Sequence, residues 1–137
     1  MEDEHSKEYT VHFDKHTFGG ESMGRLADGR AIFAAYVLPG ETAKVELVLE
    51  KKSFVKAVVT EISETAPNRI QARCKHFGVC GGCAYQNLSY ADQMILKEGL
   101  VYEQLERIGG MEKPPVKAIL PSPNPFYYRN SLQFHSD

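Results

Sequence analysis

Three features of the sequence predict a mainly β fold built around a small closed barrel. Apolar and polar residues alternate over much of residues 8–62, turn signals recur there, and β-branched residues are frequent in residues 54–62. Period-two alternation is typical of strands that bury one face, and turns at roughly 8–12-residue spacing are typical of small β domains. A sheet of only about 55 residues hides its edges most economically by closing on itself. We therefore predict an OB-like barrel of about five short strands.

The expected strands follow one another between recognisable turns. Tyr9, Val11 and Phe13 alternate with polar residues in the first strand. The pair at 28–29, Asp-Gly, predicts a tight hairpin, because glycine accepts the positive φ that such a turn requires. The Pro-Gly pair at 39–40 marks the next break, and two further strands lie on either side of residues 51–53. We expect the barrel domain to span residues 8–66.

The second half of the chain, residues 67–137, predicts a cysteine-rich loop, one helix and the start of an α+β central domain. We expect the helix over residues 90–108, because Ser89 can cap its first turn with Asp92 at the capping-box position. The two glycines at 109–110 supply its end. An apolar stripe at helical spacing is expected to pack against other parts of the protein; it consists of Met94, Val101, Leu105 and Ile108. Residues 128–134 read as a strand that begins an incomplete domain, so we expect the chain to be part of a longer protein.

The composition is that of a globular protein without a strong overall attraction to nucleic acid. Of its 137 residues 42% are hydrophobic, and 16 Lys and Arg stand against 18 Asp and Glu. No apolar run approaches the ~20 residues of a membrane span. The acidic start MEDEHSKEYT lacks the basic and apolar regions of a signal peptide. We therefore expect the protein to lie in the reducing cytoplasm, where clustered thiols are more often metal ligands or catalysts than disulfides. We also expect it to be a monomer.

All the cysteines of the chain lie in one short stretch, at Cys74, Cys80 and Cys83. The Cys-x2-Cys pair allows two thiolates to bind one centre from a tight turn, and the glycines between them let the backbone fold closely around it. An iron–sulfur cluster normally takes four thiolates, so a fourth ligand would have to come from elsewhere. Structural zinc is the alternative, with His76 or His135 as its fourth ligand. Unliganded cysteines, or a disulfide between Cys74 and Cys83, are the third interpretation.

Longer stretches of sequence around the cysteines resemble one enzyme family. The stretch CKHFGVCGGCAYQNLSYADQMILKEGL (74–100) resembles the cysteine signature of the RNA uracil-5-methyltransferases, and SPNPFYYRNSLQF (122–134) resembles a second stretch of the same family. The expected barrel, with GGESMGRL and VLPGE in its turns, resembles the TRAM domain that precedes the cluster in one branch of the family. The resemblance covers nearly the whole chain.

The resemblance implies a role for the cysteines and a set of cofactors. Cys74, Cys80 and Cys83 would be three of the four ligands of a [4Fe–4S] cluster, with the fourth ligand outside this chain. The family uses S-adenosylmethionine to form 5-methyluridine in ribosomal or transfer RNA, and its cofactor pocket and catalytic cysteine lie in a domain that this chain lacks. We therefore expect no catalytic residue here, and a recognition role for this part of the enzyme.

Basic residues near the expected turns are the candidates for RNA contact, since OB-like barrels bind single strands through charge and stacking. The candidates are Arg25, Arg30, Lys51, Lys52 and Lys56 in the barrel, and Arg129 and Asn130 in the stretch that matches the family. The alternative for the cations is that they are solvated turn charges. An alternative function for the whole chain is a stand-alone RNA-binding module whose cysteine tail is stabilised by zinc or by an iron–sulfur cluster.

Overall fold

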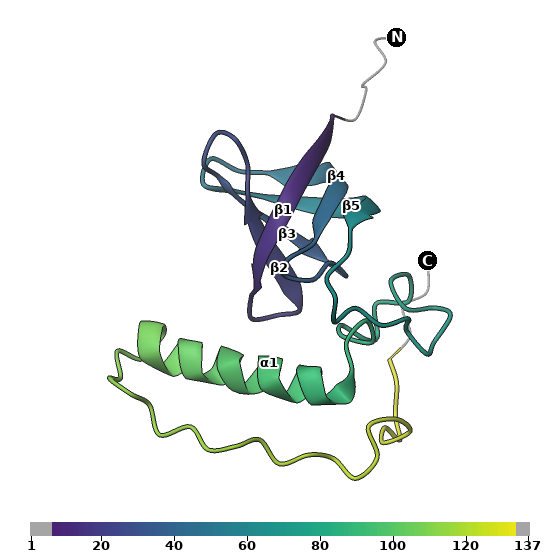
Figure 1. Cartoon of the computed structure of the whole chain (residues 1–137), viewed down its shortest axis with the longest axis vertical. Coiled ribbons are helices and arrows are strands. Elements are labelled where there is room, and N and C mark those ends of the chain that lie inside the picture. The colour runs from purple at the N-terminus through teal and green to yellow at the C-terminus, as the bar shows by residue number, and fades with distance from the viewer. Residues whose placement is uncertain (1–6, 134–137) are drawn as a thin grey trace.

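The computed structural model describes residues 7–133, and its N-terminal half is a five-stranded barrel (Figure 1). The strands are β1 (Glu8–His16), β2 (Glu21–Arg25), β3 (Ala31–Ala35), β4 (Thr42–Glu50) and β5 (Phe54–Glu64). They close in the order β1-β2-β3-β5-β4, and β1 pairs with both β2 and β4. Only β3 and β5 run parallel. The predicted mainly β, OB-like fold is confirmed.

The barrel core is formed by every second residue of its strands. Val11 and Phe13 of β1 point inward, and the core continues through Ile32 and Ala34 of β3 and through matching positions of β4 and β5. A bulge between Phe13 and Lys15 lets β1 leave β4 and continue its pairing with β2. The period-two pattern in the sequence therefore corresponds directly to the two faces of the closed sheet.

The expected hairpin at residues 28–29 joins β2 to β3. Gly29 has a φ of 89°, in the left-handed region that glycine adopts without strain. Asp28 accepts a 2.9 Å hydrogen bond from the backbone N–H of Arg30, which closes the turn.

The predicted helix begins where its cap was expected. Helix α1 (Tyr90–Glu103) is followed directly by a single π-helical turn, η1 (Gln104–Ile108). The Ser89 hydroxyl accepts a 3.1 Å bond from the backbone N–H of Asp92 and donates to the Asp92 carboxylate at 2.9 Å. The cap satisfies one of the N–H groups that a helix start leaves without an intrahelical partner.

The apolar stripe of this helix is not packed as expected. Val101 is 52% exposed and Ile108 is 78% exposed, and no residue of α1 or η1 is buried. The helix contacts the barrel at few points, one of which is a 2.8 Å ion pair between Lys15 of β1 and Glu103. A cavity of about 510 Å³ separates the β1–β2 turn from the helix, next to Phe18. The prediction of packing is wrong because no layer among residues 7–133 covers the stripe.

After η1 the chain returns along the helix without regular structure (Figure 1). The backbone N–H of Ile119 bonds to the carboxylate of Glu98 at 3.1 Å, and that of Ser122 bonds to the Tyr90 hydroxyl at 2.7 Å. The strand expected over residues 128–134 is not formed in residues 128–133, because no strand edge lies beside them to pair with. Among residues 7–133 no helix is both long and apolar enough to cross a membrane.

Candidate functional site

The three cysteines lie in a loop whose two ends are held together next to the barrel. Arg69 and Leu88 form an isolated antiparallel bridge, and the backbone N–H of Ile70 donates to the Asn87 carbonyl at 2.9 Å. We call residues 69–88 the cysteine loop. Leu88 also packs with Leu38 and Ala66 in a small second core beneath the barrel. The base of the loop is therefore fixed, although most of its length is exposed.

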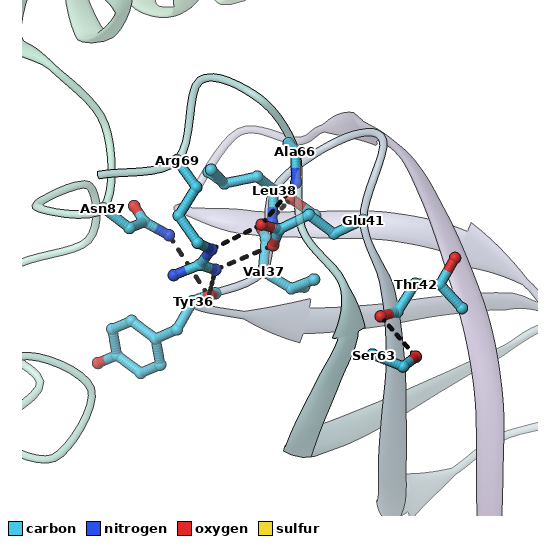
Figure 2. A network of polar contacts seen from close by, with 10 residues as sticks. Tyr36, Val37, Leu38, Glu41, Thr42, Ser63, Ala66, Arg69 and Asn87 are labelled. Atoms are coloured by element: carbon cyan, nitrogen blue, oxygen red, sulfur yellow. Dashed lines mark hydrogen bonds and ion pairs between the residues drawn. The ribbon is translucent and has the colours of Figure 1, made fainter. Parts of the chain in front are cut away.

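A buried ion pair connects this base to the barrel. Figure 2 shows the guanidinium of Arg69 facing the carboxylate of Glu41, with distances of 2.6 Å from Nε to Oε1 and 2.9 Å from Nη2 to Oε2. The carboxylate is fully buried, and it also accepts hydrogen bonds from the backbone N–H groups of Leu38 and Ala66. A two-pronged Arg–carboxylate contact with further donors satisfies both charges, as a buried pair requires.

The surroundings of Glu41 determine its protonation. Burial pushes the pKa of Glu41 upward, but the hydrogen bonds from Arg69, Leu38 and Ala66 and the charge of Arg69 outweigh this, so that the pKa lies below its ordinary value. The carboxylate is therefore ionised at neutral pH and holds the cysteine loop as a charged group.

Tyr36 provides a second contact between the barrel and the loop. Its carbonyl accepts hydrogen bonds from Arg69 Nη2 at 2.9 Å and from Asn87 Nδ2 at 3.4 Å (Figure 2). Its φ of 65° is unusual for a residue with a side chain, and its ring meets the ring of Phe77 edge to face at 5.1 Å. The Asn87 Oδ1 atom is buried without a hydrogen-bond partner among the described residues. The polar contacts therefore reach from the barrel into the cysteine loop itself.

Within the loop, tight turns place backbone donors around the first cysteine. The backbone N–H of His76 points at Cys74 Sγ at 3.4 Å, and that of Cys74 donates to the Gln86 side chain at 3.0 Å. Gly78 and Gly81 both have positive φ values, which allow the chain to turn sharply between the cysteines. N–H groups directed at a sulfur tune a metal bound to it.

The loop suits a soft metal centre by its chemistry. Cys74, Cys80 and Cys83 are all exposed, and none of them forms a disulfide. A cluster needs the sulfur atoms to approach one centre. In the described range 7–133 no group of three His, Cys, Asp or Glu side chains is gathered as a metal site. The three thiols are donors that both iron–sulfur clusters and zinc accept, and binding of either would require the loop to draw them together. His135, the more distant candidate ligand for zinc, lies outside the described residues.

Two of the predicted RNA-binding cations of the barrel are neutralised by neighbouring acids. Arg30 forms 2.8 Å ion pairs with both Asp28 and Glu50, and Lys56 pairs with Glu21 at 3.1 Å. These pairs lie at the surface, where each contributes little to stability, but they reduce the positive potential that RNA would meet.

The remaining barrel candidates lie at two different turns. Arg25 donates to the carbonyl of Gly29 at 3.0 Å, in the β2–β3 hairpin. Lys51 and Lys52 are exposed in the β4–β5 turn and form no ion pair among residues 7–133. The structure therefore leaves these three side chains available for a ligand, and their role stays a prediction.

Arg129 and Asn130 lie on the irregular C-terminal segment, near a contact that the sequence did not predict. Arg129 lies over the ring of Tyr128 at 5.9 Å, and Asn130 is exposed. Next to them, the guanidinium of Arg73 lies 4.7 Å from the Phe126 ring centre and 5.0 Å from that of Tyr127. Arg73 also donates to the Tyr127 hydroxyl at 2.9 Å. The aromatic run at 126–128 was the sequence signal for this contact, but nothing in the sequence indicated its partner.

His16, the last residue of β1, is partly buried against the cysteine loop. Burial lowers its pKa to about 4, and its ring meets Tyr85 of the cysteine loop edge to face at 5.7 Å. Burial also raises the pKa of Tyr85. His16 lines a cavity of about 300 Å³ at the start of α1. Asp92 lines the same cavity, and the Ser22 hydroxyl lies 3.3 Å from His16 Nδ1 while donating to the Val37 carbonyl at 2.6 Å. Because Ser22 is itself fully buried and its proton is used by that carbonyl, we assign His16 to packing and not to catalysis.

The structure defines a class of protein in which a small closed β-barrel anchors an exposed loop of three thiols, a candidate metal loop. No family model matches the chain. It is 38% identical over 121 residues to an uncharacterized RNA methyltransferase of Aquifex aeolicus, covering 88% of this chain and 28% of the relative. It is 39% identical over 116 residues to one of Gloeobacter violaceus, covering 85% of this chain and 25% of the relative. Over most of its length the chain is thus a relative of RNA methyltransferases, as the cysteine signature predicted.

The chain spans about a quarter of the length of these curated relatives. Among solved structures it is similar to a tRNA (uracil-54, C5)-methyltransferase of Pyrococcus abyssi in complex with S-adenosyl-L-homocysteine. The sequence identity is 21%, the TM-score is 0.40, and the match covers 74% of this chain and 22% of that one.

Proposed function

We propose that this chain is the RNA-recognition and iron–sulfur part of an S-adenosylmethionine-dependent RNA (uracil-5-)methyltransferase. The observation that carries the proposal is the sequence relationship to RNA methyltransferases across 88% of the chain, in a region that contains all three cysteines. The finer assignment to uracil C5 rests on the cysteine signature at residues 74–86 and on the stretch at 122–134.

In this proposal, Cys74, Cys80 and Cys83 hold three corners of a [4Fe–4S] cluster, and a fourth ligand comes from polypeptide beyond the chain. The cluster supplies a structural centre that orders the loop. The turns between the cysteines, the N–H directed at Cys74 Sγ and the Gln86 contact support this role, because they arrange the backbone around the first thiol before a metal is bound.

The chemical step requires groups that this chain does not contain. A thiolate that adds to C6 of uracil activates C5 toward the methyl group, which is nucleophilic catalysis, and the target base has to leave its stack first. The part of the enzyme described here contributes binding and orientation of the RNA. We expect it to act as a monomer in the cytoplasm, on ribosomal or transfer RNA.

The experiment that tests this function uses the complete gene product purified without oxygen. We expect four irons per protein, and transfer of labelled methyl groups from S-adenosylmethionine to uridine C5 in unmodified RNA. Cys80→Ser should lose most of the iron, whereas Ser53→Ala, at an exposed barrel turn, should retain it. Stoichiometric zinc without iron, or methylation at a position other than uracil C5, would contradict the proposal.

A further inference from the structure

Acidic and basic side chains are unevenly distributed along the chain, although its net charge is only −2. Residues 65–91 contain Arg69, Arg73 and Lys75 and no acid, and residues 113–133 contain three further cations and no acid. These two segments meet in the structure where Arg73 contacts residues 126 and 127. Of the six cations only Arg69 forms an ion pair among the described residues, and it does so with Glu41.

In the barrel, acids and cations are interspersed, and several of the cations are paired. Its cations at Arg30, Lys44 and Lys56 are each paired with carboxylates at 3.1 Å or less. A polyanion is drawn to uncompensated positive charge, because affinity comes from replacing counterions at its phosphates. Arg25, Lys51 and Lys52 of the barrel form no ion pair among the described residues, but Glu50 directly precedes Lys51, whereas the segments beside the cysteine loop contain no acid at all. We therefore expect the surface beside the cysteine loop to attract a phosphate backbone more strongly than the barrel turns do.

Two tyrosine rings at this surface are largely exposed. Tyr127 is 88% exposed and Tyr128 is 67% exposed, although both are large enough to favour burial. Tyr127 is also held at a φ of 58°, a strained conformation for a residue with a side chain. Its contact with Arg73 fixes the ring, but it buries little of it. Exposed aromatic rings beside cations are the feature on which the bases of single-stranded nucleic acids stack, and strained residues cluster at functional sites.

We propose that Arg73, Phe126 and Tyr127, which we call the Arg73 platform, form a binding surface for single-stranded RNA, with a base stacked on Tyr127 and a phosphate near Arg73. This inference deepens the proposed function and rests on it for the identity of the nucleic acid. Lys75 follows Arg73 by two residues and Arg129 follows Tyr127 by two residues, so both add positive charge close to the platform. Because Arg73 directly precedes Cys74, RNA on the platform lies next to the first cysteine of the cysteine loop.

The test measures binding of the complete gene product to a single-stranded RNA of about 12 nucleotides, a length that spans one such surface. The RNA carries a fluorescent adenine analogue whose emission falls when it stacks. Arg73→Gln should weaken binding about tenfold and reduce the salt-dependence slope by about 0.7, the value for one phosphate contact on a single strand. Tyr127→Ala should weaken binding about tenfold, abolish the quenching and leave the salt slope unchanged.

Two further variants separate the platform from a general structural effect. Tyr127→Phe keeps the ring and loses only the hydroxyl bond to Arg73, so it should retain quenching. Lys52→Gln removes an exposed cation of the barrel and should change affinity less than Arg73→Gln does. Loss of binding in Lys52→Gln with unchanged binding in Arg73→Gln and Tyr127→Ala would overturn the inference.

Methyl transfer distinguishes failure of this inference from failure of the proposed function. If the wild-type protein methylates uracil C5 and Tyr127→Ala keeps both its KM for RNA and its quenching signal, the platform is wrong and the function stands. If the wild-type protein binds RNA through Arg73 and Tyr127 but methylates no uridine, the platform stands and the proposed function is wrong.

Discussion

At the scale of single residues, the decisive contact is the one between Glu41 and Arg69. Glu41 lies just after the Pro-Gly turn that precedes β4, and Arg69 opens the cysteine loop. Their contact ties a loop with few buried side chains to a well-packed barrel. A buried pair of this kind stabilises less than its geometry suggests, because both ions lose water, but removing one partner leaves the other uncompensated.

We predict that Glu41→Gln lowers the free energy of unfolding at neutral pH by about 3 kcal/mol, the usual cost of breaking a buried pair. The pKa of Glu41 is lowered in the folded state, so its carboxylate stabilises the fold above the ordinary pKa of 4.5, and this contribution is lost as the pH falls through the lowered value. The difference between the two proteins should therefore shrink in acid. Urea unfolding at a series of pH values measures it.

Glu50→Gln is the matched control, since Glu50 pairs with Arg30 at the surface. It should change stability by less than about 0.5 kcal/mol. His16 stays in both variants, so the destabilisation that it causes as the pH falls from 6.5 to about 4 is common to them. An equal effect of Glu41→Gln and Glu50→Gln would show that the pair does not hold the fold.

At the scale of elements, two glycines are expected to respond in opposite ways to the addition of a side chain. Gly24 of β2 lies against β1, where an added Cβ would collide with the carbonyl oxygen of His12 and lie 2.8 Å from Val11 Cγ1. Gly99 lies inside α1 with no neighbouring atom within 4 Å of an added Cβ. In the strand, glycine is required by the close approach of two backbones, whereas in the helix it only adds conformational freedom.

We predict that Gly24→Ala destabilises the barrel by about 2 kcal/mol or more, because overpacking forces the strands apart. Gly99→Ala should stabilise the protein by about 0.5–1 kcal/mol through helix propensity. Thermal unfolding followed by circular dichroism compares the two variants. A stabilising Gly24→Ala would mean that β1 and β2 are not paired in the register described, in which Gly24 lies opposite Phe13.

At the scale of the whole molecule, order is distributed unevenly along the chain. The barrel has a closed hydrophobic core, whereas the cysteine loop and residues 111–133 are irregular and mostly exposed. Segments with few buried apolar contacts open easily, and ligands that bind only their ordered form stabilise them. Metal and RNA are the ligands that the proposals assign to these segments.

We predict that iron reconstitution protects the cysteine loop from trypsin. Cleavage after Lys75, which is exposed between two cysteines, should slow about tenfold or more in the iron-loaded complete gene product. Cleavage after Lys117, outside the loop, serves as the internal reference, and Cys80→Ser should remove the protection. Equal cleavage at Lys75 with and without iron would contradict a cluster held by this loop.

Local features of the sequence were enough to predict most of the regular structure. The alternation through Val11 and Phe13, the glycine at the β2–β3 turn and the cap at Ser89 each act between neighbouring residues, so their effect can be read without knowing the fold. The cysteine spacing likewise predicted a candidate metal loop and a resemblance that the RNA methyltransferase relatives confirm at the level of that class.

The tertiary structure alone decided which distant residues meet. Arg73 and Tyr127 are 54 positions apart, and Glu41 and Arg69 are 28 apart. Such pairings depend on the path of the intervening chain, which periodicity and turn chemistry do not encode. For the same reason the sequence showed five cations on the barrel but not the acids that neutralise some of them across strands, and it showed an apolar helical stripe but not that this stripe stays uncovered.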